Sequence, residues 1–451
     1  MRRRVVRRDR YGGETMRADI QTEMGPGLRS PGSVRWTVII WLLIGGIINY
    51  LDRTNLSIAA KPMMDELHLS NTDIGLMGTV FSWTYALMQL PAGWLVDRFG
   101  AKRMYSIAVL WWSLATLLMG ACNKMSQFIP ARFLLGMGEA PCFPTSAKVT
   151  AAWFPRKERG LATGIWDSSS KWGPALAPPI LVAILMATNW RMLFYVTGLI
   201  GVVFIVFWML FYRSPEHSRR LTPEERAYIQ ADGAGEEQQI GQARIRWGTL
   251  FTYRTMWGMI LGFFCTIWIW NIFLNFLPLY LQKTYHVTLS ALGVYASIPW
   301  VGGIIGDILG GYITKRIADA GVASPMNAKR AMITVCAILA AVSVILVPLV
   351  HSLAFTITLL TLALAFISAI TGSAWALAGD VAPGPMVASV GAIQNFGGYF
   401  GGAFSPVITG MIADSTGSYS LAFISGGIIA GCAALCYWFI VKKPISDEVR
   451  G

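Results

Sequence analysis

Four ionisable side chains lie within stretches that are otherwise apolar enough for lipid: Asp52, Arg53, Arg132 and Glu139. Charges inside a membrane are costly, so they must be paired, face a water-filled cavity or mark the end of a span. Asp52 and Arg53 are adjacent, hence about 100° apart on a helix, and serve different partners. Arg132 and Glu139 share one helical face, about 10.5 Å apart along the axis. Two acids and two arginines would suit anion binding and proton movement if the fold brings them to one cavity.

The alternative is that these four residues form structural ion pairs, which the cost of a charge in lipid would also favour. Further polar side chains accompany them in the same apolar stretch and in the next one: Asn49, Tyr50, Thr54, Asn55, Tyr85 and Gln89. A purely structural pair needs no such surroundings, so the pattern favours a functional site.

The elements that position these residues are membrane helices. Of 451 residues, 54% are hydrophobic and 14% are charged, which excludes an ordinary soluble domain and predicts an all-α, polytopic membrane protein. Apolar runs of about 20 residues predict twelve transmembrane helices. They fall at 36–60, 73–95, 104–122, 127–152, 161–187, 191–212, 253–281, 290–314, 329–350, 353–379, 386–412 and 419–441.

The net charge of +13 is distributed by loop rather than gathered on one face, so nucleic acid is not a predicted partner. Lys and Arg concentrate in alternate loops and in the arginine-rich start of the chain. By the positive-inside rule both termini and the central loop are cytoplasmic, and an even number of spans agrees with that.

The chain divides at its one long polar stretch. The predicted parts are a disordered basic cytoplasmic tail (1–35), an N-terminal six-helix bundle (36–212), a cytoplasmic linker (213–252), a C-terminal six-helix bundle (253–441) and a cytoplasmic tail (442–451). In the linker, Thr222 as N-cap, Pro223 at the first helical position and Glu225 as capping-box partner predict a short helix.

Cysteines and histidines show no metal-ligand spacing, and no Ser/His/Asp arrangement can be assembled. The sequence therefore predicts a non-enzyme with no metal and no cofactor. A small carboxylate and the lipid bilayer are the predicted partners, and the expected oligomeric state is a monomer.

The loop GWLVDRFGAKR (93–103) resembles the signature loop of the major facilitator superfamily, and twelve spans with a polar hinge after the sixth fit its two six-helix bundles. Asp97, Arg98 and Arg103 in this loop are candidate cytoplasmic-gate residues, because Asp97 can cap a neighbouring helix or pair with an arginine across the bundle.

Four further segments resemble the anion:cation symporter family, in particular bacterial carriers of sugar acids such as galactonate, glucarate and hexuronates. They are NYLDRTNLSIA (49–59), FSWTYALMQLPAGWL (81–95), RFLLGMGEAPCFP (132–144) and NFGGYFGG (395–402). The resemblance implies that Arg53 grips the substrate carboxylate beside Tyr50 and Tyr85.

The resemblance further implies that Arg132 is coupled to Asp52 and Glu139 as proton-binding acids. In the second half, Asn271, Trp375 and Asn395 fall where hydroxyl-reading side chains are expected, with packing as the alternative for Trp375 and a helix contact for Asn271.

Three more charges lie in predicted spans. Asp167 and Lys171 either pair along the fifth span or touch substrate together with Ser170, and the structural pairing is favoured. Asp307 is predicted to be a cytoplasmic-gate residue rather than a ligand.

Together these features predict a multi-pass protein of the bacterial inner membrane that imports a small organic anion by proton symport and alternating access. The substrate is expected to be a sugar acid (aldonate, aldarate or hexuronate), and protons are the coupling ion. Bringing one negative charge inward costs about 2.3 kcal/mol per 100 mV, so about two protons per monoanion are expected. An organic-anion exporter or exchanger of the same fold is the alternative, and a transporter-like sensor is a weaker one because the linker is short.

Overall fold

The computed structural model describes residues 34–230, 247–382 and 387–445, and all regular structure in them is helical. The predicted tails up to residue 33 and from residue 446, residues 231–246 of the linker and the side chain of Asp97 lie outside the described residues. The all-α prediction is confirmed for the part that is described.

The helices of the N-terminal half and the linker follow the predicted spans. They are α2 (Val34–Leu67), α3 (Asn71–Phe99), α4 (Ala101–Gly120), α5 (Met125–Glu139), α6 (Cys142–Trp153), α7 (Arg156–Asp167), α8 (Ser169–Ala187), α9 (Trp190–Phe211), η1 (Pro215–His217), α10 (Pro223–Gln230) and α11 (Trp247–Leu250).

The C-terminal half repeats the pattern of long apolar helices. They are α12 (Arg254–Tyr285), α13 (Leu289–Asp319), α14 (Pro325–Leu346), η3 (Val347–Leu349), α15 (Leu353–Val381), α16 (Val387–Gly402), α17 (Ser405–Thr416), α18 (Ser420–Leu435) and η5 (Cys436–Ile440).

Three predicted spans are each divided between two consecutive helices. The span at 127–152 corresponds to α5 and α6, which are separated at Ala140 and Pro141. A proline lacks the backbone N–H of a regular helix, so a break is favoured there. Glu139 is therefore the last residue of α5. The predicted spans at 161–187 and 386–412 are also each divided, the first between α7 and α8 and the second between α16 and α17.

Eight helical segments within the described residues are long and apolar enough to cross a membrane, with α7 and α8 joined as one of them. The helices α3 to α6, α16 and α17 are not among these eight. The multi-pass character is supported, and the count of twelve spans stays a prediction.

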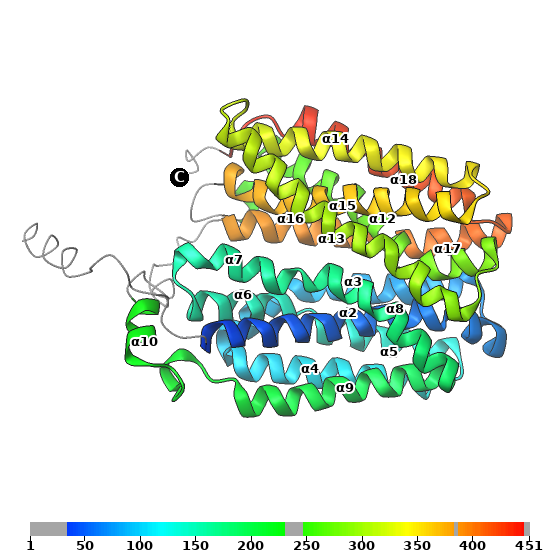
Figure 1. The fold of residues 1–451 in the computed structure, drawn as a ribbon, viewed down its shortest axis with the longest axis horizontal. Helices are drawn as coiled ribbons and strands as arrows, with labels where there is room; N and C mark the ends of the chain where they lie inside the picture. The colour runs from blue at the N-terminus through cyan, green and yellow to red at the C-terminus, as the bar shows by residue number, and fades with distance from the viewer. Residues whose placement is uncertain (1–33, 231–246, 383–386, 446–451) are drawn as a thin grey trace, which may run out of the picture.

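The helices run along one long axis and form two bundles, one from each half of the chain (Figure 1). We call the end that carries α10, the start of α2 and the end of η5 the linker end. The opposite end, with Leu67, Tyr285 and Thr416, is the far end. α10 is fixed to the N-terminal bundle at the linker end.

Arg35 makes that attachment. Its Nη1 lies 3.2 Å from the Glu225 carboxylate of α10, and its Nε lies 3.1 Å from Glu158 of α7. The Thr222 hydroxyl accepts a hydrogen bond from the Glu225 N–H at 3.2 Å, as expected for an N-cap. The Glu225 side chain, however, bonds to Arg35 and not back to Thr222, because a buried arginine attracts the carboxylate more strongly than a backbone N–H does.

The two halves pack closely at the far end, where α3 meets α17 and α8 meets α13. A side chain at Gly75 would collide with the backbone of Pro406, and one at Gly410 with the backbone of Asn71. Glycine is required at these two positions because the helix backbones approach each other directly.

Asp414 of α17 adds a polar seal at the same place. Its carboxylate accepts hydrogen bonds from the backbone N–H groups of Asn71 (3.0 Å) and Thr72 (2.7 Å), the first residues of α3. The Asn71 amide oxygen in turn accepts hydrogen bonds from Lys283 (3.0 Å) and Tyr419 (2.6 Å). The carboxylate caps the start of α3 from the other half of the molecule.

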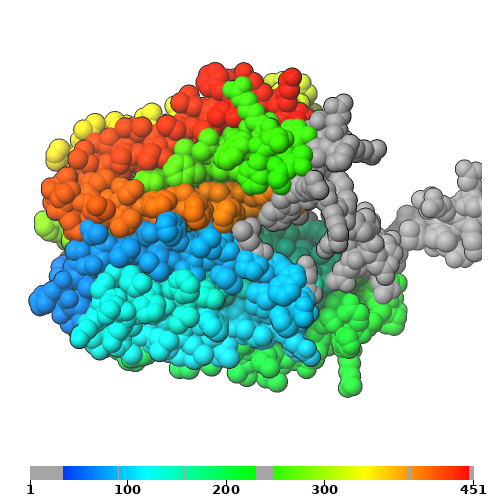
Figure 2. Space-filling view, turned by 180° about the vertical axis from the view of Figure 1, so that it is seen from behind, coloured from blue at the N-terminus to red at the C-terminus, as the bar shows by residue number. Residues whose placement is uncertain are grey.

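Toward the linker end, two further pairs of side chains make polar contacts between the halves. Asn395 donates to Gln89 at 3.5 Å, and Lys171 lies 3.1 Å from Asp307. Beyond these pairs, the described residues form no hydrogen bond or ion pair between the halves. Figure 2 shows the halves pressed together at the far end and a hollow between them toward the linker end.

Candidate functional site: a charged cavity between the halves

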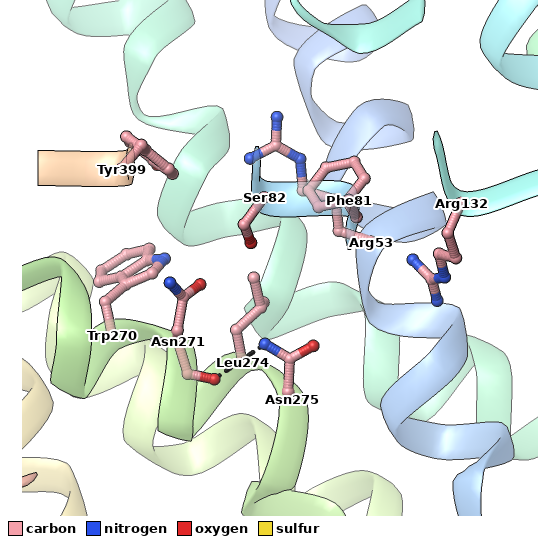
Figure 3. Close-up of a pocket in the computed structure, with 9 residues that line it drawn as sticks. All are labelled: Arg53, Phe81, Ser82, Arg132, Trp270, Asn271, Leu274, Asn275 and Tyr399. Carbon is pink, nitrogen blue, oxygen red and sulfur yellow. Dashed lines mark hydrogen bonds between the residues drawn. The ribbon is translucent and has the colours of Figure 1, made fainter. Parts of the chain in front are cut away.

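A small cavity lies where α2, α3 and α5 of the first half face α12 and α16 of the second (Figure 3). Its lining residues are Arg53, Phe81, Ser82, Arg132, Trp270, Asn271, Leu274, Asn275 and Tyr399. Both charged members come from the N-terminal half, whereas the C-terminal half contributes amides and aromatic or apolar side chains.

The middle of α2 explains how an aspartate and an arginine can be neighbours in a membrane helix. Residues 48–60 are buried on every side of α2, so each face of the helix meets protein rather than lipid. Arg53 turns toward α5 and the cavity. Asp52 turns toward Asn55 (3.5 Å), which also donates to Thr197 of α9 at 2.7 Å. The two neighbours serve different partners, as their adjacent positions predict.

Arg53 is enclosed by one carboxylate and three aromatic rings. Its Nε donates to Glu139 Oε2 at 2.6 Å. Its Cζ lies 4.4 Å from the ring centroid of Tyr85, 4.7 Å from that of Tyr50 and 5.1 Å from that of Phe81. Cation–π contacts of this kind hold a guanidinium in place without using its N–H groups. Its Nη2 has no hydrogen-bond partner among the described residues and remains available for an acceptor.

Glu139 pairs with Arg53 and not with Arg132, although Arg132 and Glu139 share one helical face. The other Glu139 oxygen, Oε1, and Asp52 Oδ2 are buried without a hydrogen-bond partner in the described part of the chain. Arg132 makes no ion pair with Glu139, in keeping with their separation of two helical turns along α5, and Arg53 reaches the Glu139 carboxylate from α2 instead.

Arg132 is the second cation of the cavity. It is 2% exposed, and neither its Nε nor its Nη2 has a hydrogen-bond partner among the described residues. A buried cation without an ion-pair partner is strongly unfavourable unless an anion approaches it. Arg53 and Arg132 thus contribute three unpartnered N–H-bearing nitrogens to the lining of one cavity, a donor set that suits a carboxylate.

The opposite wall is neutral and fixed. The Asn271 amide nitrogen donates to the Gly402 carbonyl at 3.0 Å, and that of Asn275 donates to the Asn271 carbonyl at 2.9 Å. Tyr399 lies 5.4 Å from Tyr85 across the cavity, centroid to centroid. These groups offer hydrogen bonds and ring surface, which suits the hydroxyl-bearing carbons of a small ligand.

Several predicted ligands lie outside the cavity lining. The Ser170 hydroxyl donates to the Asp167 carbonyl at 2.8 Å, within its own helix. Trp375 is 45% exposed and packs edge-on against Phe263. Asn395 contacts Gln89 of the other half. Their roles in binding stay predictions.

The predicted gate residues lie near the linker end. Arg98 and Arg103 are exposed, and the Arg98 Cζ lies 5.3 Å from the ring centroid of Trp94. Since the Asp97 side chain is outside the described residues, the gate assignment stays a prediction.

Lys171 joins the halves. Its Nζ lies 3.1 Å from Asp307 on α13 and 3.8 Å from Asp167, one turn earlier in its own half. The pairing along the fifth span is present, and Asp307 is a third member that the sequence did not connect to it.

Sequence reasoning missed five polar or aromatic lining residues: Phe81, Ser82, Trp270, Asn275 and Tyr399. A signal for Asn275 was available, because it follows Asn271 by one helical turn on the same face of an apolar helix. Tyr399 lies inside the glycine-rich motif 395–402, and the sequence reasoning considered the glycines of that motif rather than its tyrosine.

An all-helical bundle whose two halves enclose a charged cavity has the architecture expected of a membrane transporter. A family model described as "Major Facilitator Superfamily" matches residues 42–405, and the chain belongs to that superfamily. Transport, and not enzymatic catalysis, is what the named relatives share.

Two relatives carry names of sugar-acid transporters. The chain is 36% identical over 414 residues to a "Probable L-galactonate transporter" of Escherichia coli (strain K12), covering 92% of this chain and 91% of the relative. It is 32% identical over 424 residues to a "Probable galactarate/D-glucarate transporter" of the same organism, covering 90% and 94%.

One solved structure supports the fold. It is a bacterial homologue of the human lysosomal transporter Spinster in an inward-facing and unoccupied conformation, with a TM-score of 0.75 at 19% identity, covering 93% of this chain and all of that one. At this identity the likeness speaks for the fold alone.

Proposed function

We propose that this protein is a proton-coupled importer of a sugar acid that works by alternating access in the bacterial inner membrane. The single observation that carries the proposal is the shared use of Arg53. Its Nε donates to Glu139. Its Nη2, like the Nε and Nη2 of Arg132, has no hydrogen-bond partner among the described residues. A substrate carboxylate and Glu139 therefore compete for one guanidinium.

This competition provides a coupling mechanism. When Glu139 takes up a proton it loses its charge and its hold on Arg53, which can then turn both of its outer nitrogens to the substrate in a bidentate pair. When the substrate leaves and Glu139 loses the proton, the Arg53–Glu139 pair reforms and the cavity is neutral again. Proton and anion binding thereby favour each other.

The charge count supports a stoichiometry of about two protons. With both acids ionised, Asp52, Arg53, Arg132 and Glu139 sum to zero. One proton compensates a bound monoanion. A second proton on the remaining acid makes the loaded carrier positive, which an interior-negative potential favours by about 2.3 kcal/mol per 100 mV.

The orientation follows from the charge of the loops. The linker end carries the basic loops, so we infer that it faces the cytoplasm. The tight packing at the far end and the hollow at the linker end then correspond to the inward-facing state of the cycle. The names of the relatives, which include galactonate, galactarate/D-glucarate and sulfoacetate transporters, support an organic anion as the substrate.

Transport by purified protein in liposomes tests the proposal. Counterflow of labelled D-galactonate is expected without a pH gradient, and accumulation only when the outside is acidic. An inward current on a supported membrane is expected with a monoanionic substrate. Counterflow that no pH gradient can turn into accumulation would identify an exchanger, and release of substrate driven by inward proton flow would identify an exporter.

A further inference from the structure

The second charged group between the halves consists of Asp167, Lys171 and Asp307, which we call the inter-half cluster. Lys171 lies within 3.1 Å of Asp307 and 3.8 Å of Asp167, so one positive charge stands against two negative ones. With all three ionised the cluster carries a net charge of −1. No step of the proposed coupling mechanism uses it.

On its N-terminal side, the inter-half cluster is connected through Tyr50 to Arg53, which lines the cavity. Gly173, two residues after Lys171, packs directly on Tyr50, and the Tyr50 ring contacts Arg53. Tyr399, which lines the cavity, also lies close enough to Lys171 to interact with it electrostatically.

The cluster is also connected to the cavity on its C-terminal side. Asp307 follows Trp300 by two helical turns on α13, on the same side as the buried Gly303 and Gly310. The Trp300 ring packs edge-on against Trp270, a lining residue of the cavity, at 5.0 Å. Asp307 therefore lies on the interior face of α13, toward the linker end from the cavity wall.

The three side chains of the cluster differ in exposure. The Lys171 side chain is 7% exposed, whereas those of Asp307 and Asp167 are 27% and 41% exposed. The ammonium is therefore buried, while both carboxylates remain partly accessible. Tyr50 interacts electrostatically with Asp167, and Tyr399 with Lys171.

An independent observation ties the cluster to a ligand site. The guanidinium groups of Arg53 and Arg132 are more than nine-tenths buried, line the adjacent cavity and include nitrogens without a partner among the described residues. The cavity attracts a carboxylate, and the neighbouring cluster presents carboxylates of its own.

We propose that the inter-half cluster selects substrates by charge: it favours a sugar acid with one carboxylate and a hydroxyl-rich remainder, and disfavours a dicarboxylate of the same length. Hydroxyl groups can donate to Asp167 and Asp307, whereas a second carboxylate is repelled by them. This inference rests on the proposed function, since it narrows the sugar acids to the monoanionic class. The distinction matters because the relatives include named transporters of both kinds.

Competitive uptake by the purified protein in liposomes, with D-galactonate and galactarate as matched six-carbon probes, tests this directly. The unchanged chain is expected to prefer galactonate by at least tenfold. Asp167→Asn removes one negative charge and leaves the 3.1 Å Lys171–Asp307 pair intact, so the variant should fold. At an effective dielectric constant near 20, a unit charge about 10 Å away changes affinity roughly tenfold, so the preference should fall by about that factor.

Asp65→Asn is the matched control. It removes the same charge from an exposed pair with Lys61 outside the cavity and should leave the preference unchanged. Asp307→Asn, checked for folding by its thermal unfolding profile, should reduce the preference as Asp167→Asn does. Equal uptake of both acids by the unchanged chain, or a preference that survives both cluster substitutions, would overturn the inference while the proposed function stands. Uptake of neither acid, nor of any other aldonate, aldarate or hexuronate, would overturn the proposed function as well.

Discussion

The two halves of the molecule share their all-helical build but differ in where charge is buried. Within the described bundles, every charged side chain classed as buried belongs to the N-terminal half: Arg35, Asp52, Arg53, Arg132, Glu139 and Lys171. The buried polar groups of the C-terminal half are amides and hydroxyls, such as Asn271, Thr266 and Gln394.

This difference assigns different tasks to the two halves. Buried charges are costly to keep and respond strongly to a proton or an anion, so the half that holds them senses both. Burying neutral amides and aromatic rings costs less free energy than burying charges. These groups provide hydrogen bonds and determine the shape of the cavity wall. The N-terminal half is thus expected to grip and couple, and the C-terminal half to read the uncharged part of the substrate.

Removing Glu139 should have the largest effect, because it leaves Arg53 buried without its carboxylate. Glu139→Ala is expected to lower the free energy of unfolding by about 3 kcal/mol, measured by denaturation in detergent. The double variant Glu139→Ala/Arg53→Met removes both charges and should recover most of that loss. Equal destabilisation in the single and double variants would mean that the pair is not the source of the effect.

Arg53→Lys should weaken substrate binding at least tenfold. A lysine keeps the charge but lacks the planar fork that binds a carboxylate bidentately, and it stacks less well on Tyr50 and Tyr85. Binding can be measured by scintillation proximity on purified protein. Arg219→Lys, the same exchange at an exposed position of the linker, is the control, and unchanged affinity in folded Arg53→Lys would remove Arg53 from the site.

Asp414→Asn should loosen the far end by about 1–2 kcal/mol, because an amide cannot replace both charge-assisted acceptor oxygens at the start of α3. The measurement is labelling of a cysteine placed at Ser82 by an impermeant thiol reagent from the far-end side, in a background without native cysteines. Faster labelling than in the Asp414 parent is expected, and an identical rate would exclude Asp414 from the seal.

The same residue predicts a pH dependence. Burial raises the Asp414 pKa, but hydrogen bonds from Thr72 and Asn71 outweigh this and hold the pKa below its ordinary value of 3.8. A lowered pKa in the closed state means that the stabilisation is complete above pH 3.8 and is lost as the pH falls through the lower value. The ratio of the labelling rates of Asp414→Asn and its parent should therefore stay constant from pH 8 to pH 5, since the thiolate fraction of the probe cysteine changes equally in both proteins.

The smallest effect is expected from the neutral wall. Asn271→Ala removes one amide, and neutral hydrogen bonds contribute about 0.5–1.5 kcal/mol each, so substrate affinity should fall about two- to tenfold while proton coupling persists. A loss as large as that of Arg53→Lys would contradict the division of tasks between the halves.

The sequence predicted the helices well because membrane spans are long apolar runs. A run of this kind can be recognised from neighbouring residues alone. It also predicted that Arg53 and Glu139 lie in one region, since charges inside spans are rare. It did not predict their direct pairing, nor the contact of Lys171 with Asp307. Both depend on how helices far apart in the chain rotate against one another, which no local pattern specifies.

The boundaries of α5 and α6 show the same limit. The predicted span treated 127–152 as one helix, whereas the chain is divided after Glu139, which places this carboxylate at a helix end beside Arg53. Pro141 was visible in the sequence, but prolines also occur inside intact helices here, such as Pro91 in α3. The surrounding packing, rather than the proline alone, decides whether a helix is divided.

Glu139→Gln tests the central claim most directly, because glutamine resembles the protonated acid and cannot release a proton. The variant is expected to exchange labelled for unlabelled substrate across the liposome membrane at a rate near that of the unchanged protein. It should fail to accumulate substrate under an inward proton gradient, since it cannot discharge its proton and return empty. Accumulation equal to that of the unchanged protein would contradict the account and leave Glu139 as a structural partner of Arg53.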